Sequence, residues 1–164
     1  MDRNKIVLAG AAVIVVGLVA YKMQASKTYE PIVFMNEKYS HVDETEVNKV
    51  ENHFFTPGGV AIPEAGSFIQ ISKYDHPDLT AGQVSRVQDQ VIRSFGLRPV
   101  EGYEDRFFGL FRGSVPVYGY MGPDAFVLQV GPNDSEADEG KLLAAAADRI
   151  DELVEIPTEF SRER

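Results

Sequence analysis

Cysteine is absent from this 164-residue chain, and basic residues are scarce relative to acidic ones. The lack of cysteine excludes a disulfide framework, a thiolate zinc site, a cysteine nucleophile and a cysteine-ligated cluster. Sixteen Lys and Arg residues stand against twenty-five Asp and Glu residues, which gives a formal net charge of −9. Nucleic-acid binding requires a basic surface that displaces phosphate counterions. We therefore expect no nucleic-acid partner.

The usual catalytic signatures are also missing. The sequence contains no GxGxxG, GxxxxGK[ST], HExxH or GxSxG pattern and no EF-hand loop. These patterns carry the commonest nucleotide, metal and acyl-transfer sites. Gly58 and Gly59 form an isolated pair in a Pro-rich loop that does not lead into a helix, so they do not predict a phosphate site. We predict a chain that is not an enzyme, with no catalytic residues and no cofactor.

A long apolar run near the N-terminus is the clearest feature that is present. The segment 6–21 (IVLAGAAVIVVGLVAY) has sixteen residues without a charge, an amide or a proline. Each Leu, Ile or Val favours insertion into a bilayer by roughly 0.3–0.6 kcal/mol, and a tyrosine suits the interface. We expect a single membrane-spanning helix in contact with lipid. Its anchor residues are Ile6, Leu8, Gly10, Gly17 and Tyr21.

The flanks of this run bear on its fate and its orientation. Signal-peptide cleavage needs small residues at two positions before the cut, and the triplets 18–20 and 23–25 each supply only the second. This favours a retained signal-anchor over a cleaved signal peptide. A small excess of positive charge before the run predicts an N-terminus on the cytoplasmic or interior side and an exported C-terminal domain.

The remaining sequence predicts one domain. Residues 1–27 are the expected anchor and the start of a stem, and residues 28–164 the expected α+β domain. Its clearest helix begins after Thr80, which opens the capping-box pattern T-A-G-Q, and ends at Gly96. Between them, apolar residues recur at helical spacing, namely Val84, Val87, Val91, Ile92 and Phe95.

Two further helices and six strands are expected around that helix. S-H-V-D at residues 40–43, followed by apolar residues at 47, 50 and 54, predicts a short helix to about residue 52. A last helix is expected from Ser135 to about Glu155, stopped by Pro157. Strands are expected over residues 31–36, 67–74, 99–103, 106–112, 115–121 and 125–130. The predicted fold class is α+β, a transmembrane helix followed by an antiparallel sheet with two or three helices packed on one face.

Aromatic residues are concentrated in the predicted strands between residues 106 and 130. Exposed aromatic patches with polar rims mark contact surfaces. We expect an interaction surface for a partner protein at Phe107, Phe111, Tyr118 and Tyr120. The alternative is that the tyrosines are ordinary strand residues, half in solvent.

The three histidines, with the acidic residues near them, are the only metal-type cluster that the sequence offers. If their loops meet, His41, His53 and His76 with Asp78 could bind zinc or a similar ion. As ends of one predicted helix, His41 and His53 would point away from each other. Turn and N-capping chemistry is the competing interpretation of residues 75–78.

The sequence thus predicts a contact function. We expect a membrane-anchored, non-catalytic accessory or assembly subunit of a membrane complex, cell envelope or membrane-containing virion. Its expected partners are membrane lipid, other membrane-complex or envelope proteins and further copies of itself. The alternative is a membrane-tethered ligand- or metal-binding sensor that uses the histidine loops.

Overall fold

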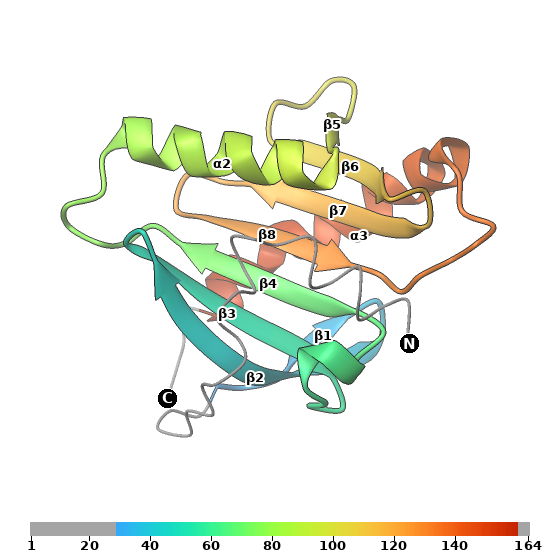
Figure 1. Cartoon of the computed structure of the whole chain (residues 1–164), viewed down its shortest axis with the longest axis horizontal. Helices are drawn as coiled ribbons and strands as arrows, with labels where there is room; N and C mark the ends of the chain where they lie inside the picture. Colours follow the sequence, from blue (N-terminus) through green and yellow to red (C-terminus); the bar gives the residue numbers. More distant parts are fainter. Residues whose placement is uncertain (1–28, 161–164) are drawn as a thin grey trace.

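The computed structural model describes residues 29–160, which form one curved antiparallel sheet with two long helices (Figure 1). The eight strands follow the spatial order β1-β2-β3-β4-β8-β7-β6-β5, so two meanders meet where β4 pairs with β8. The elements are β1 (Ile32–Phe34), β2 (Glu37–Val47), β3 (Val50–Pro57), the 3-10 turn η2 (Ile62–Glu64), β4 (Phe68–Lys73), α2 (Ala81–Phe95), β5 (Arg98–Pro99), β6 (Arg106–Phe111), β7 (Val115–Met121), β8 (Ala125–Val130) and α3 (Glu139–Phe160).

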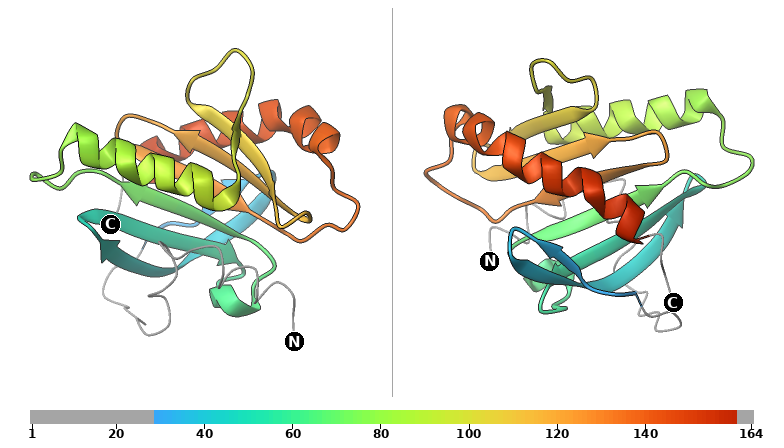
Figure 2. Two further views of the ribbon diagram at one scale, coloured as in Figure 1. Left: turned by 45° about the horizontal axis from the view of Figure 1, so that its top comes forward. Right: turned by 180° about the vertical axis from the view of Figure 1, so that it is seen from behind.

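The two helices cover opposite faces of the sheet (Figure 2). Val91 and Phe95 of α2 pack on one face, against a core that includes Phe54 of β3. Ile150 and Leu153 of α3 pack on the other face. Every residue of the central strand β8 is buried, as expected for a strand covered on both sides. The predicted packing of helices on one face was therefore wrong.

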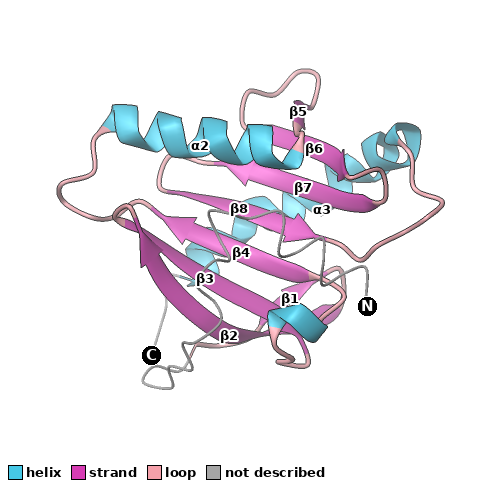
Figure 3. Cartoon of the chain, viewed as in Figure 1, coloured by secondary structure: helices cyan, strands magenta, loops and turns pink. Residues whose placement is uncertain are grey.

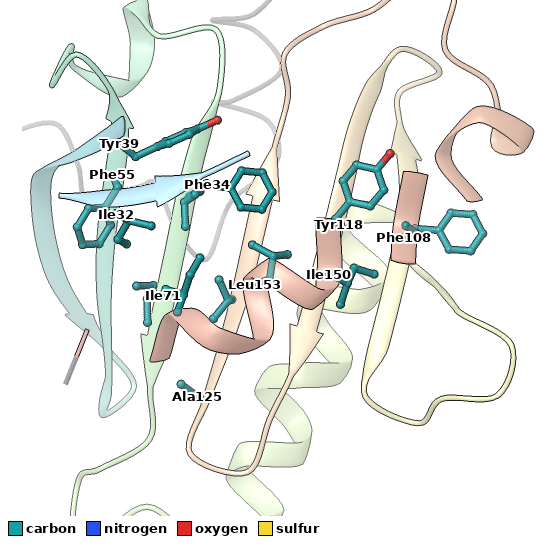
Figure 4. Packing of buried hydrophobic residues seen from close by; sticks show 14 of the residues in the cluster. Ile32, Phe34, Tyr39, Phe55, Ile71, Phe108, Tyr118, Ala125, Ile150 and Leu153 are labelled. Carbon is teal, nitrogen blue, oxygen red and sulfur yellow. The ribbon is translucent and has the colours of Figure 1, made fainter. Parts of the chain in front are cut away.

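The core on the α3 face is the larger of the two clusters of buried residues. Side chains of β1, β2, β3, β4, β6, β7 and β8 converge on α3 there (Figure 4). Each Å² of apolar surface that such side chains bury stabilises the folded state by roughly 25 cal/mol. The labelled members of this cluster are Ile32, Phe34, Tyr39, Phe55, Ile71, Phe108, Tyr118, Ala125, Ile150 and Leu153.

Helix α2 has the ends that its sequence predicts. The Thr80 side chain accepts from the Gln83 amide, and the Gln83 side chain accepts from the Thr80 amide, which completes the capping box. Gly96 ends the helix in the left-handed region, at φ 63°. A Cβ atom on Gly109 of β6 would lie 2.8 Å from the Gly96 carbonyl oxygen. Glycine at 109 therefore lets the end of α2 lie directly against the sheet.

The segment predicted as a helix over residues 40–52 is a β-hairpin. Strands β2 and β3 pair from Tyr39↔Pro57 to Val47↔Val50, which leaves a two-residue turn. Its residues, Asn48 and Lys49, both have positive φ, at 54° and 70°. Two successive residues of this kind are the signature of a type I′ turn, which matches the twist of the flanking strands.

Other element boundaries differ from prediction in smaller ways. The expected strand over residues 99–103 is a two-residue strand, Arg98–Pro99, followed by a turn. Helix α3 begins at Glu139 rather than Ser135, because Asp138 caps it by accepting from the Lys141 amide at 2.8 Å. It also continues beyond Pro157 to Phe160.

The predicted fold class and membrane location are corrected by this architecture. The described chain is dominated by the eight-stranded half-barrel sheet (Figure 3) and is not a helix-anchored α+β protein. Within residues 29–160, neither helix has the length and apolar character to span a bilayer. The expected single-pass protein with a transmembrane signal-anchor and an exported domain is not supported. The anchor residues Ile6, Leu8, Gly10, Gly17 and Tyr21 lie outside the described residues.

Candidate metal site

A β-bulge in β2 places His41 and Glu44 on the same face of the sheet. His41 pairs with Phe55, and Glu44 pairs with His53, so three steps along β2 match two steps along β3. Without the extra residue, positions 41 and 44 would point to opposite faces, because side chains alternate along a strand. The bulge turns both toward the α3 face, where Phe55 is part of the core.

The hairpin brings together His41, Glu44 and His53. His41 Nε2 lies 3.2 Å from His53 Nδ1, and Glu44 Oε1 lies 3.9 Å from the same His53 Nδ1. One ligand atom from each residue can be chosen so that all three lie within 4.8 Å of one another. In a tetrahedral zinc site with bonds of about 2.0–2.1 Å, ligand atoms are separated by about 3.3 Å. The spacing of the two imidazole nitrogens already matches one edge of that tetrahedron.

A second carboxylate, that of Glu51, lies behind the His53 ring. Its Oε1 lies 3.1 Å from His53 Nε2, on the side of the ring away from His41. A carboxylate this close favours the tautomer that carries the proton on Nε2, which leaves a lone pair on Nδ1. Metal-binding histidines are commonly oriented by such a carboxylate behind the ring. In that tautomer Nδ1, which lies 3.2 Å from His41 Nε2 and 3.9 Å from Glu44 Oε1, can offer its lone pair to a cation.

Aromatic side chains enclose one side of the histidine pair. The Tyr29 ring lies 4.4 Å from the His41 ring and 5.0 Å from the His53 ring, measured between centroids. Phe55 meets His41 edge-on at 5.1 Å. His53 itself is 1% exposed. The site is therefore shielded from water on its inner side, while Glu44 and Glu51 reach partly into solvent.

The charge state of the His41 side chain is the one that a metal ligand needs. Burial, and to a lesser degree repulsion from His53, lowers the pKa of His41 from 6.5 to about 4. The His41 imidazole is therefore neutral at pH 7, with a lone pair on one nitrogen. Cation binding requires this neutral form, because a protonated imidazole has no lone pair to offer.

The structure does not bring His76 and Asp78 to this group. Both lie in the loop between β4 and α2, where His76 Nδ1 accepts from the Asp78 amide at 3.1 Å. Among residues 29–160, the group of three metal-type side chains contains Glu44 in their place. Sequence reasoning missed Glu44 and Glu51 because the hairpin was read as a helix. The signal that identifies them is the turn pair Asn48-Lys49, which places residue 44 opposite residue 53.

The predicted interaction residues lie in the meander β6–β7. Phe111 is buried on the α2 face, where its ring meets Phe95 at 5.5 Å, and Phe107 packs against the same core. Tyr118 is buried on the opposite face, with the Arg149 guanidinium 5.5 Å from its ring centre, and Tyr120 packs beside it. Phe111 and Tyr118 therefore serve the cores under the chain's own helices, and neither ring is exposed.

Comparisons of this chain with protein-family models, with curated proteins and with solved structures give no match.

Proposed function

We propose that this protein binds a divalent transition-metal ion, of which zinc is the representative, through His41, Glu44 and His53. The observation that carries the proposal is the 3.2 Å separation of His41 Nε2 and His53 Nδ1 beside the Glu44 carboxylate. Two imidazoles and one carboxylate are a ligand set that zinc and iron(II) accept. Glu51, behind His53, is the supporting carboxylate of such a site.

The site fits reversible binding better than a purely structural role. Structural zinc sites are closed by four protein ligands, whereas three protein ligands leave a position for an exchangeable partner. The described residues supply three ligands here, and Glu44 is 26% exposed. We therefore propose a sensing or buffering role, in which the ion enters from the Glu44 side. The expected role as an accessory subunit acting through protein contacts stays a prediction without a supporting observation.

The competing explanation of the histidine pair is a plain hydrogen bond between neutral rings, with no ion. Calorimetric titration of the chelator-treated full chain with zinc distinguishes the two. We expect one bound ion per chain, with affinity reduced at least 100-fold by His41→Ala and by Glu44→Gln. Glu51→Gln should weaken binding about 10–100-fold, as expected for a supporting carboxylate.

His76→Ala is the matched control, because His76 is the one histidine outside the group. It should leave the zinc affinity unchanged. Absence of binding at micromolar zinc would contradict the proposal. An equal loss of affinity in His76→Ala and His41→Ala would contradict it as well.

A further inference from the structure

A cavity lies on the α2 face of the hairpin, opposite the metal site, between the hairpin turn and helix α2. Its outer part has a volume of about 410 Å³ and is lined by Asn48, Lys49, Gln83, Arg86, Val87 and Gln90. A smaller part of about 150 Å³ shares three of these residues and extends inward to the sheet. Small-molecule sites occupy roughly 300–1,000 Å³, so the outer part alone falls in this range.

The outer part of this groove is basic and rich in amides. Lys49 and Arg86 line it, and none of the described residues that line it is an Asp or a Glu. Within residues 29–160, neither cation takes part in an ion pair with a carboxylate. The side-chain oxygen of Gln83, Oε1, accepts hydrogen bonds from the Thr80 amide and hydroxyl. The side-chain NH₂ group of Gln83 can therefore donate to a ligand. In a chain of net charge −9, two cations without an acidic neighbour among the described lining residues are a local departure from the overall charge.

The inner part of the groove is mostly apolar. Val47, Val50, Val87 and Phe126 line it, together with the polar residues Asn48, Asn52 and Gln90. Val50 and Phe126 are 3% and 1% exposed and belong to well-packed strands. An apolar end and a cationic mouth in one groove match a ligand with an apolar tail and an anionic head.

We infer that this groove binds a small amphiphilic organic anion, a carboxylate with a short apolar chain. The carboxylate would pair with Arg86 and Lys49 and accept from the side-chain amides at the mouth. The apolar chain would occupy the inner part beside Val87 and Phe126. Arginine is suited to this role because its planar guanidinium matches a carboxylate with two parallel hydrogen bonds.

Binding of octanoate to the full chain tests this inference. Titration is followed by calorimetry and by backbone amide NMR shifts, at concentrations below micelle formation. We expect octanoate to shift the amides of residues 48–50 and 86–90. Acetate lacks the tail and octan-1-ol lacks the charge, so each should bind at least 10-fold more weakly than octanoate.

A matched pair of variants on α2 identifies the head-group contact. Arg86→Gln should weaken octanoate binding about 10-fold, whereas Arg93→Gln should not, because Arg93 is exposed on the same helix but does not line the groove. Both are surface substitutions that leave the core intact. The inference is overturned if octanoate does not bind, if octan-1-ol binds as well as octanoate, or if the two variants behave alike.

Discussion

Two polar clusters lie on opposite faces of strand β3, and they differ in how their polar side chains find hydrogen-bond partners. On the α2 face, Asn52, Gln70 and Ser72 bond to one another, with Ser72 Oγ donating to Asn52 Oδ1 at 2.6 Å and Gln70 Nε2 donating to Ser72 Oγ at 2.8 Å. All three are at most 2% exposed. Because these groups are uncharged and largely use one another, the network is structural.

The cluster on the α3 face begins one residue later, at His53. It combines two imidazoles with the carboxylates of Glu44 and Glu51, and ligand atoms of His41, Glu44 and His53 lie within 4.8 Å of one another. It also reaches solvent through the two carboxylates. The comparison teaches that burial alone does not identify a functional site. What marks the histidine cluster is the close grouping of three side chains that can each offer a ligand atom to a metal ion.

The largest effect should come from the helix that covers the histidine face. Leu153→Ala removes a side chain that is 0% exposed in the α3 core, and should lower the free energy of unfolding by about 2–5 kcal/mol. Leu143→Ala on the same helix is the control, because Leu143 is 52% exposed and should cost no more than about 0.5 kcal/mol. Urea denaturation measures both. Equal losses would show that α3 is not packed as described.

Zinc should stabilise the protein through one cluster only. At a free zinc concentration 100-fold above the Kd, the free energy of unfolding should rise by about 2.7 kcal/mol in the wild type. The rise should vanish in His41→Ala and persist in Ser72→Ala, which alters the opposite face. Chemical denaturation with and without zinc gives both values. Zinc stabilisation that survives His41→Ala would place the ion elsewhere.

Disrupting the network of Asn52, Gln70 and Ser72 should lower the free energy of unfolding without changing the affinity for zinc. Asn52→Ala leaves the buried Ser72 Oγ without its acceptor and removes one of the two acceptors of Gln70 Nε2, which should cost about 1–3 kcal/mol of unfolding free energy. The zinc affinity of this variant should equal that of the wild type. A parallel loss of zinc affinity would mean that the two clusters are not independent.

The smallest predicted effect is a pH dependence of stability that comes from Tyr74 on the α2 face. Burial raises the pKa of the Tyr74 phenol above its ordinary value of 10, although its hydrogen bond from Gln88 Nε2 opposes this. The unfolded chain therefore releases this proton at lower pH than the folded chain, so stability is lost as pH rises above 10. Tyr74→Phe should lose less stability than the wild type between pH 9 and 11. Identical slopes in alkaline urea denaturation would contradict this.

Helix α2 and the strands β4, β7 and β8 could be predicted from sequence because their local signals agree with one another. Thr80, Gln83 and Gly96 define both ends of α2, and its apolar residues have a single period. The alternating or continuously apolar segments between Gly- and Pro-containing turns likewise indicate strands and no other element. The two-sided cover of the sheet was not predictable, because it depends on the order in which the strands pair.

The candidate site was only half predictable, for one local reason. Val47, Val50 and Phe54 have helical spacing, but in the hairpin Val47 and Val50 are cross-strand partners. Asn48 tolerates positive φ, so the pair Asn48-Lys49 was the competing signal for a tight turn. Reading the segment as a helix separated His41 from His53, and the bulge that brings His41 to the face of Glu44 and His53 has no clear sequence pattern.

Anomalous diffraction at the zinc edge, from crystals of the zinc-loaded full chain, tests the metal site most directly. The account predicts one peak at about 2.0–2.2 Å from His41 Nε2, His53 Nδ1 and a Glu44 carboxylate oxygen. A structure at saturating zinc that shows no peak there, with the two histidines still joined by their 3.2 Å contact, would contradict it.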